Sequence, residues 1–151
     1  MSVRRATSAD IETLAALRRA WIEEDAGPVN DPAFEAAFAD WYAAEDDHRV
    51  AWIAFVDGTP AGMLNLLEYR RMPRPGRLDS RWGYVSNVFV LGQYRNRGLG
   101  RELLDAMLAF ARERNYVRLI LSPSERARPL YGRVGFGPSD ELLLLRLTYP
   151  A

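Results

Sequence analysis

The stretch 84–115 constrains the fold of this chain more than any other part of the sequence. Its first part, 84–90, is rich in β-branched and aromatic residues, which favour a strand. After a turn that contains two glycines, apolar residues recur at the three- and four-residue spacing of a helix: Leu99, Leu103, Leu104, Met107, Leu108 and Phe110. The pattern predicts a strand, a tight turn and a long amphipathic helix that runs from Gly98 to Asn115.

The turn itself, 95–101, is a candidate site for a phosphate-bearing cofactor. A helix that begins at Gly98 presents unpaired N–H groups and the positive end of its dipole to a ligand in the turn. Gly98 and Gly100 let an anion approach the backbone closely. Three basic residues add charge: Arg95, Arg97 and Arg101. A Walker-type loop needs a lysine, which the sequence lacks, and a dinucleotide fingerprint needs a third glycine at a spacing that is not met here.

Composition limits the remaining classes of protein. The 151 residues, 48% of them apolar, are enough for one domain, expected to span 1–151, and few for two. Twenty basic and twenty acidic residues leave no net charge to attract nucleic acid or an anionic membrane, and no segment has the length of an apolar membrane span. Without cysteine, and with His48 as the single histidine, a thiolate or histidine metal site is not expected. We expect a cytoplasmic protein that binds no nucleic acid, membrane or metal.

The order of periodic segments predicts a mixed α/β domain. Asp57-Gly58 is a strong hairpin signal between two of the strands. Strands are expected at 3–7, 49–56, 61–69, 84–90 and 117–121, with a final pair ending in 142–149. Helices are expected at 9–26, from 31–32 through an aromatic stripe, at 98–115 and at 126–133. The stripe consists of Phe34, Phe38, Trp41 and Tyr42 and is expected in the core, with the wall of an acceptor pocket as the alternative.

The turn resembles the pyrophosphate-binding motif of the Gcn5-related N-acetyltransferases (GNAT family). In that motif Gln or Arg, two residues, Gly, one residue, and Gly or Ala follow one another, and Arg95, Gly98 and Gly100 match it. A second signature of the family, an Ala, then Leu-Tyr, then Gly-Phe, is matched within 127–136 at the family's distance from the first. The resemblance extends to the order of elements over nearly the full chain. It implies an α+β fold: a twisted, mixed, mostly antiparallel sheet of about seven strands, flanked by about four helices and splayed at the cofactor site, between the strand at Val88 and the strand at Val117.

The same resemblance implies an acetyl-CoA-dependent N-acetyltransferase that transfers the acetyl group directly to a primary amine of a small molecule or peptide in a ternary complex. The pyrophosphate would lie on the amides of 96–101, and the pantetheine arm would pair with the main chain of 88–90 as an added strand does. Ser124 stands where an Asn often contacts that arm. The implied cofactor-binding residues are Val88, Phe89, Val90, Arg95, Asn96, Arg97, Gly98, Leu99, Gly100, Arg101 and Ser124.

Catalytic roles follow from the resemblance in part. Tyr131 stands at the position of the family's general acid, and a phenol with a reference pKa of about 10 stays protonated at neutral pH. The N–H of Val88 or Phe89 is the implied oxyanion donor. A Glu that often serves as base has no counterpart on either strand of the site. The substrate-side candidates are Glu68, Tyr84 and Ser86, with Asp79, or a water held by Ser86 or Asn87, as further alternatives for the base. The missing carboxylate keeps open a non-catalytic, acyl-CoA-binding regulatory module.

The acceptor and the oligomeric state stay open in the sequence. Arginines crowd the stretch 70–81 and favour an anionic acceptor, whereas the acidic run 23–25 favours a cationic one. A homodimer is common in the family, but no apolar pattern identifies an interface.

Overall fold

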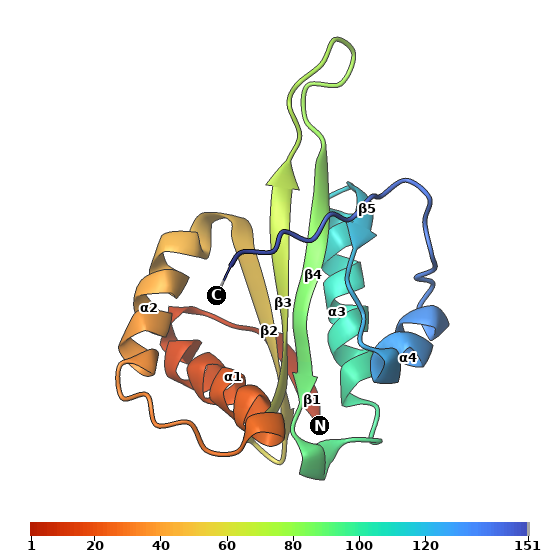
Figure 1. The fold of residues 1–151 in the computed structure, drawn as a ribbon. Helices are drawn as coiled ribbons and strands as arrows, with labels where there is room; N and C mark the ends of the chain where they lie inside the picture. Colours follow the sequence, from red (N-terminus) through yellow and green to blue (C-terminus); the bar gives the residue numbers. More distant parts are fainter. Residues whose placement is uncertain (151) are drawn as a thin grey trace.

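The strands of the sheet lie side by side in the order in which they occur in the sequence, β1-β2-β3-β4-β5 (Figure 1). A computed structural model describes residues 1–150. The strands are β1 (Ser2–Arg5), β2 (Arg49–Val56), β3 (Thr59–Arg70), β4 (Arg81–Val90) and β5 (Tyr116–Ile120). Neighbouring strands are antiparallel except β4 and β5, which are parallel. A parallel pair requires a crossover, and helix α3 (Leu99–Glu113) provides it.

The β2–β3 hairpin has the predicted two-residue turn. Asp57 and Gly58 have φ values of 48° and 79°, and Val56 pairs with Thr59. Two successive left-handed residues match the right-handed twist of the flanking strands, which is why Asp-Gly favours such turns.

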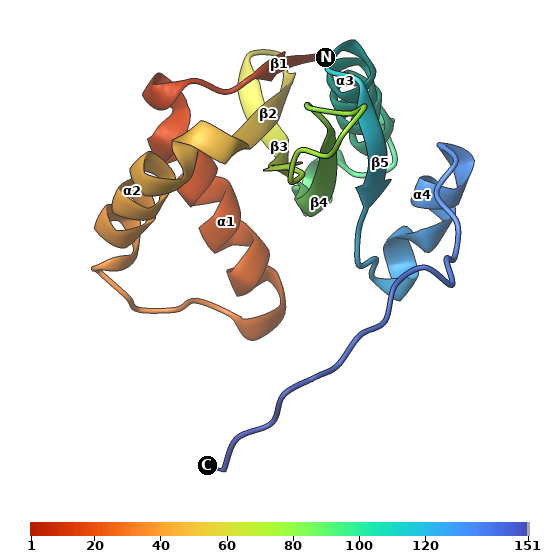
Figure 2. The ribbon, with the colours of Figure 1, turned by 90° about the horizontal axis from the view of Figure 1, so that it is seen from above.

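Helices cover both faces of the sheet (Figures 1 and 2). On one face lie α1 (Ile11–Ala26) and α2 (Phe34–Glu45); on the other lies α3, with α4 (Arg128–Arg133) beyond it. Each face therefore has its own core. The α3 side includes Trp52, Leu64, Leu66, Val85, Leu103, Leu104 and Met107. The side of α1 and α2 includes Leu14, Leu17, Tyr42, Ile53, Met63 and Phe89.

A bulge in β4 reverses which face its side chains point to. Asn65 pairs with Ser86 but Met63 pairs with Phe89, so β4 contains one residue more than β3 between these pairs. Asn87 lies in this bulge with a left-handed φ of 53°. Strict alternation would put Phe89 on the same face as Val85, yet Phe89 packs against α1. The bulge thus directs Phe89 to one core and Val88 to the other.

The sheet is splayed between β4 and β5, as predicted. The pairing joins Arg81 to Tyr116 and ends where Tyr84 meets Ile120. Beyond this point, 85–90 has no partner strand on that side within residues 1–150. Its main-chain groups there are open to a ligand.

The prediction of about seven strands was wrong, because the sheet described in residues 1–150 has five. The final pair does not form: residues 134–150 are in neither helix nor strand. Gly135 has a φ of 109° and Pro138 lacks an N–H, so the segment before Glu141 does not form a first strand that could pair with 142–149. This last segment extends away from the body (Figure 2). The first strand is also shorter than predicted, because Thr7 caps the helical turn that precedes α1.

Candidate cofactor and acceptor site

The start of α3 is an open, left-handed turn. Gly98 immediately precedes α3 and has a φ of 85°, and Asn96 has a φ of 61°. A Cβ on Gly98 would meet no atom within 4 Å, so the space in front of the turn is open. The first helical hydrogen bond runs from the N–H of Glu102 to the carbonyl of Gly98 (3.0 Å), and no side chain caps the helix. Three backbone donors, those of residues 99–101, therefore precede the first helical bond and are suited to an anion.

The three arginines of this turn differ in what they can offer an anion. Arg95 donates from Nε to the carbonyl of Val90 (2.9 Å) and pairs with Glu24 of α1 (2.6 Å). The hydrogen bond from Arg95 lowers the pKa of Glu24, so this pair is fully charged at neutral pH. Arg101 pairs with Asp105 one helical turn on (2.9 Å).

Arg97 is the arginine of the turn that no carboxylate engages within residues 1–150. Its guanidinium lies over the Tyr94 ring at 5.6 Å and is exposed. The expectation that the charge of Arg95 serves the anion is therefore weakened. The Arg95 side chain fixes the loop to α1, and Arg97 retains free charge.

Gly100 has a packing role that the motif alone did not suggest. A Cβ at this position would lie 3.0 Å from Leu130 Cδ2, a contact tighter than side chains normally make. Gly100 thus lets α4 pack closely on the first turn of α3. Because Tyr131 follows Leu130, this contact also sets where the candidate acid lies.

Tyr131 is half-buried on α4, against the same core cluster as Val88 and Val90 of β4. Its ring meets Phe136 edge-on at 5.9 Å. Burial raises the pKa of Tyr131, so the phenol keeps its proton at neutral pH. Ser124 lies in the turn before α4, where its Oγ accepts a hydrogen bond from the N–H of Ala127 (3.3 Å).

The three substrate-side candidates lie along β3 and β4. Tyr84 contacts Ser122 through its hydroxyl (3.3 Å), at the point where the splay begins. Ser86 donates to the carbonyl of Asn65 (3.4 Å), next to the bulge. Glu68 lies further along, opposite Gly83, where β4 is still paired with β5.

Glu68 is the centre of an ion-pair network. Arg114 donates to both carboxylate oxygens (2.9 Å each), Tyr116 donates its hydroxyl, and Arg81 lies 3.6 Å away. Burial alone would raise the pKa of Glu68, but the hydrogen bonds from Arg114 and Tyr116 hold the pKa below its usual value. With both oxygens engaged outside the splay, the geometry favours a structural role over that of a base.

We predict that Glu68→Gln costs stability and spares catalysis. Removing one partner of a half-buried charge network should lower the free energy of unfolding by about 2 kcal/mol. Because the folded-state pKa is lowered, the contribution of Glu68 is present above its unfolded pKa and is lost as pH falls through the folded one. Denaturant unfolding at pH 7 and at pH 3 should show a large gap between variant and parent at pH 7 and a smaller gap at pH 3. A kcat that falls a hundredfold or more, with stability unchanged, would instead make Glu68 the base.

A cavity lies beside the bulge, on the face of the sheet that α1 and α2 cover. Its volume is about 200 Å³. Helices α1 and α2 line it with Arg18, Phe34, Phe38 and Trp41, and the sheet lines it with Met63, Asn65 and Asn87. The predicted aromatic stripe therefore divides: Tyr42 is buried in the core, whereas Phe38 and Trp41 wall this cavity. Sequence reasoning missed Arg18 and Asn65, although a polar Asn inside the apolar run 63–67 was a usable signal.

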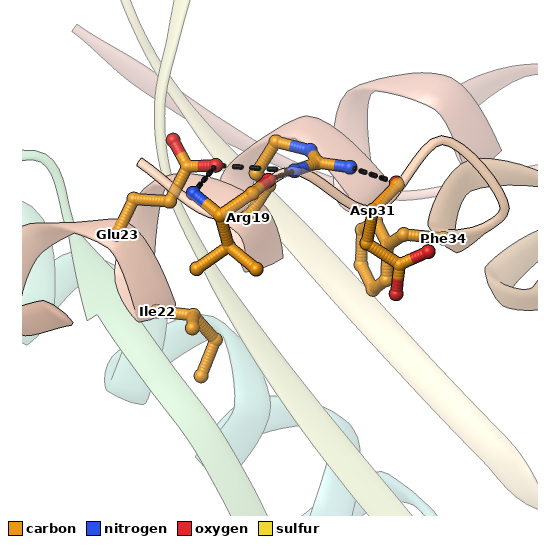
Figure 3. A pocket seen from close by; sticks show the side chains of 6 residues that line it. Arg19, Ile22, Glu23, Asp31 and Phe34 are labelled. Atoms are coloured by element: carbon orange, nitrogen blue, oxygen red, sulfur yellow. Dashed lines mark hydrogen bonds and ion pairs between the residues drawn. The ribbon is translucent and has the colours of Figure 1, made fainter. Parts of the chain in front are cut away.

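The acidic run 23–25 and the arginine-rich stretch 70–81, which favour opposite kinds of acceptor, both lie outside this cavity. A neighbouring pocket has a volume of about 170 Å³. In it Arg19 pairs with Glu23 (3.1 Å) and donates to the carbonyls of Val29 (2.7 Å) and Asp31 (2.8 Å) (Figure 3). Arg19 also pairs with Glu35 (2.7 Å). Glu23 is thus engaged, as Glu24 is by Arg95. The arginine-rich stretch 70–81 forms the far tip of the β3–β4 hairpin, at the opposite end of the molecule from the turn of residues 95–101 (Figure 1).

No group of three or more His, Cys, Asp or Glu side chains suited to a metal occurs in residues 1–150. Over the same residues, no helix has the length and apolar character needed to cross a membrane.

The open β4 edge, the left-handed Gly98 before α3 and the tyrosine on α4 form the arrangement that the resemblance to an acyltransferase family implies. Residues 14–136 match the model of the acetyltransferase (GNAT) family, and the chain belongs to this family. Its members are acetyltransferases that use acetyl-CoA as the acetyl donor.

Three known proteins show the range of the similarity. The chain is 29% identical over 90 residues to glucosamine 6-phosphate N-acetyltransferase of Trypanosoma brucei brucei, covering 60% of this chain and 59% of that protein. It is 30% identical over 111 residues to glucosamine 6-phosphate N-acetyltransferase 1 of Oryza sativa subsp. japonica, covering 72% and 65%. The match thus spans about three fifths of the length of these relatives. A predicted acetyltransferase of Clostridium acetobutylicum, solved with acetyl-CoA, has a TM-score of 0.77 at 24% identity, covering 96% and 95%, and shows the same fold.

Proposed function

We propose that this chain transfers the acetyl group of acetyl-CoA directly to the primary amine of a small molecule or peptide. One observation carries the proposal: β4 leaves its pairing with β5 at Tyr84, so the open edge 85–90 leads to the uncapped start of α3. An extended amide-containing arm can pair with such an edge, and its pyrophosphate can accept the donors of residues 99–101. Tyr131 packs against the same core cluster as Val88 and Val90 of this strand.

The residues of the site divide the chemistry between them. The amine nitrogen attacks the thioester carbonyl, a C–N bond forms, and the oxyanion is stabilised by a backbone N–H at Val88 or Phe89, beside the bulge. As the C–S bond breaks, Tyr131 gives its proton to the departing thiolate. The proton lost by the amine passes to water held at Ser86 or Asn87, because Glu68 is occupied by Arg114 and Tyr116.

A non-catalytic acyl-CoA-binding module is the second candidate. The observation that favours it is the same engagement of Glu68, which leaves no free carboxylate among the candidates on β4 and β3. Such a module would bind acetyl-CoA and release no CoA thiol in the presence of any amine.

The experiment that tests the proposal measures CoA thiol release from acetyl-CoA with a panel of primary amines. Glucosamine 6-phosphate is the first acceptor to test, because two relatives at 29% and 30% identity carry this substrate in their names. Glucosamine without the phosphate is its matched control. Acetylated product confirmed by mass spectrometry supports the enzyme, whereas tight acetyl-CoA binding without turnover across the panel supports the module.

We also propose a homodimer in which residues 142–149 of each copy pair with the open edge of β5 in the other. Leucines of this segment are exposed, Leu143 fully and Leu145 by 80%. The segment points away from its own body (Figure 2), and β5 is the last strand of the sheet, with one edge unpaired within residues 1–150. An extended segment can form backbone hydrogen bonds with a free strand edge, and this pairing can bury the apolar side chains of the segment.

The double variant Leu143→Glu, Leu145→Glu should convert the dimer to a monomer, measured by light scattering after size exclusion. Both side chains lie on the same face of an extended segment, so two carboxylates would enter the interface. Met72→Glu is the control, because Met72 is 90% exposed and lies at the hairpin tip. A monomeric parent, or a double variant that stays dimeric, would contradict this interface.

A further inference from the structure

The cavity beside the β4 bulge is lined by the guanidinium of Arg18, which no carboxylate engages within residues 1–150. Arg18 is partly buried on α1 and is the one charged side chain among the described residues that line the cavity. Within residues 1–150 it makes no ion pair. Its neighbour Arg19 gives the contrast, because that guanidinium is held by two carboxylates and two carbonyls.

Aromatic stacking fixes where the Arg18 charge lies. Its guanidinium lies over the ring of Trp21, 5.1 Å from the centroid. Trp21 in turn stacks on Phe89, with centroids 5.5 Å apart and planes 8° apart. Phe89 immediately follows Val88 at the bulge, so the stack links Arg18 to the backbone that would bind the thioester oxygen. A guanidinium on an aromatic face keeps its in-plane N–H donors available.

The sheet wall of the cavity carries two side-chain amides, those of Asn65 and Asn87. Asn65 is 8% exposed and lines the cavity, and its side chain makes no hydrogen bond within residues 1–150. Asn87 lies next to it in the bulge, also without a side-chain hydrogen bond in the described chain. Opposite them, Phe38 and Trp41 form an apolar wall. Both amides can therefore form hydrogen bonds with a molecule in the cavity.

We infer that this cavity binds the amine acceptor and that the acceptor is a compact amine whose apolar body carries an anionic group. The inference rests on the proposed function and names the acceptor class for that site. The body lies against Phe38 and Trp41, the carboxylate or phosphate pairs with Arg18, and the amine reaches the bulge past the amides of Asn65 and Asn87. A bidentate guanidinium pairing suits either anion.

The test compares matched amines that differ only in the anion. The pairs are L-phenylalanine with 2-phenylethylamine, and L-leucine with 3-methylbutylamine. Binding to the full chain is measured by saturation-transfer NMR, with and without CoA. We expect the carboxylate member of each pair to bind more tightly by about tenfold or more, and Arg18→Gln to remove that advantage. Arg18→Lys should retain part of it.

Arg112→Gln is the control variant, because Arg112 is exposed on α3 and has no ion pair within residues 1–150. It should leave the advantage unchanged. Equal or tighter binding of the amines without a carboxylate, an unchanged Arg18→Gln variant, or binding of neither member of a pair would each overturn the inference. None of these outcomes affects acetyl-CoA binding, so loss of acetyl-CoA binding counts against the proposed function alone.

Discussion

Gly98→Trp should abolish acetyl-CoA binding, with a Kd at least about a hundredfold higher, or about 2.7 kcal/mol of binding free energy lost. The Cβ of residue 98 points into open space in front of the uncapped helix start. An indole there would occupy the volume proposed for the pyrophosphate and cover the donors of residues 99–101. Isothermal titration calorimetry measures the change directly.

The control for this variant is Gly76→Trp. Gly76 has a φ of 82° and also has no atom within 4 Å of a built Cβ, so both variants introduce the same side chain with the same backbone strain, about 1 kcal/mol. Gly76 lies in the loop between β3 and β4, and the tip of this hairpin is at the other end of the molecule (Figure 1). Equal acetyl-CoA affinity in the two variants would show that the cofactor does not bind at the turn of residues 95–101.

Tyr131→Phe should lower kcat by about a hundredfold or more while the Kd for acetyl-CoA stays within about twofold. The substitution removes one hydroxyl from a half-buried ring and keeps the contact with Phe136. Burial raises the pKa of Tyr131, so the parent should keep this phenol protonated, and its activity should not fall through loss of this proton, at neutral and mildly alkaline pH.

Tyr42→Phe is the matched control, because burial also raises the pKa of Tyr42 and its hydroxyl makes no hydrogen bond within residues 1–150. It should leave kcat unchanged. A Tyr131→Phe enzyme with full turnover would show that another group protonates the thiolate. Single-turnover measurements at saturating acetyl-CoA separate such a loss from slow product release.

The predictable parts of the fold are those written in local sequence. The Asp57-Gly58 turn, the helix at 99–113 and the strand before it depend on residues close together in the chain, and each is present. The splay came from the family resemblance. The bulge at Asn87 was not predictable, because the apolar pattern of 84–90 fits either face and only the pairing with β3 decides the register.

In the site, too, the features set by local sequence were predictable and those set by tertiary contacts were not. The turn of residues 95–101 was found from its glycines, but the pairing of Arg95 with Glu24 joins residues 71 positions apart and depends on how α1 crosses the sheet. The cavity depends on four elements at once, α1, α2, β3 and β4, so no local pattern could define it. The free charge of Arg18 and the engaged charge of Arg19 are adjacent in the sequence and differ only in their tertiary surroundings.

Calorimetric titration of the purified chain with acetyl-CoA and with CoA tests the central claim most directly. The open edge of β4 and the uncapped start of α3 predict a single site with micromolar affinity for acetyl-CoA, lost in Gly98→Trp and retained in Gly76→Trp. If neither acetyl-CoA nor CoA gives binding heat at millimolar concentration, the result would contradict both the proposed enzyme and the alternative binding module.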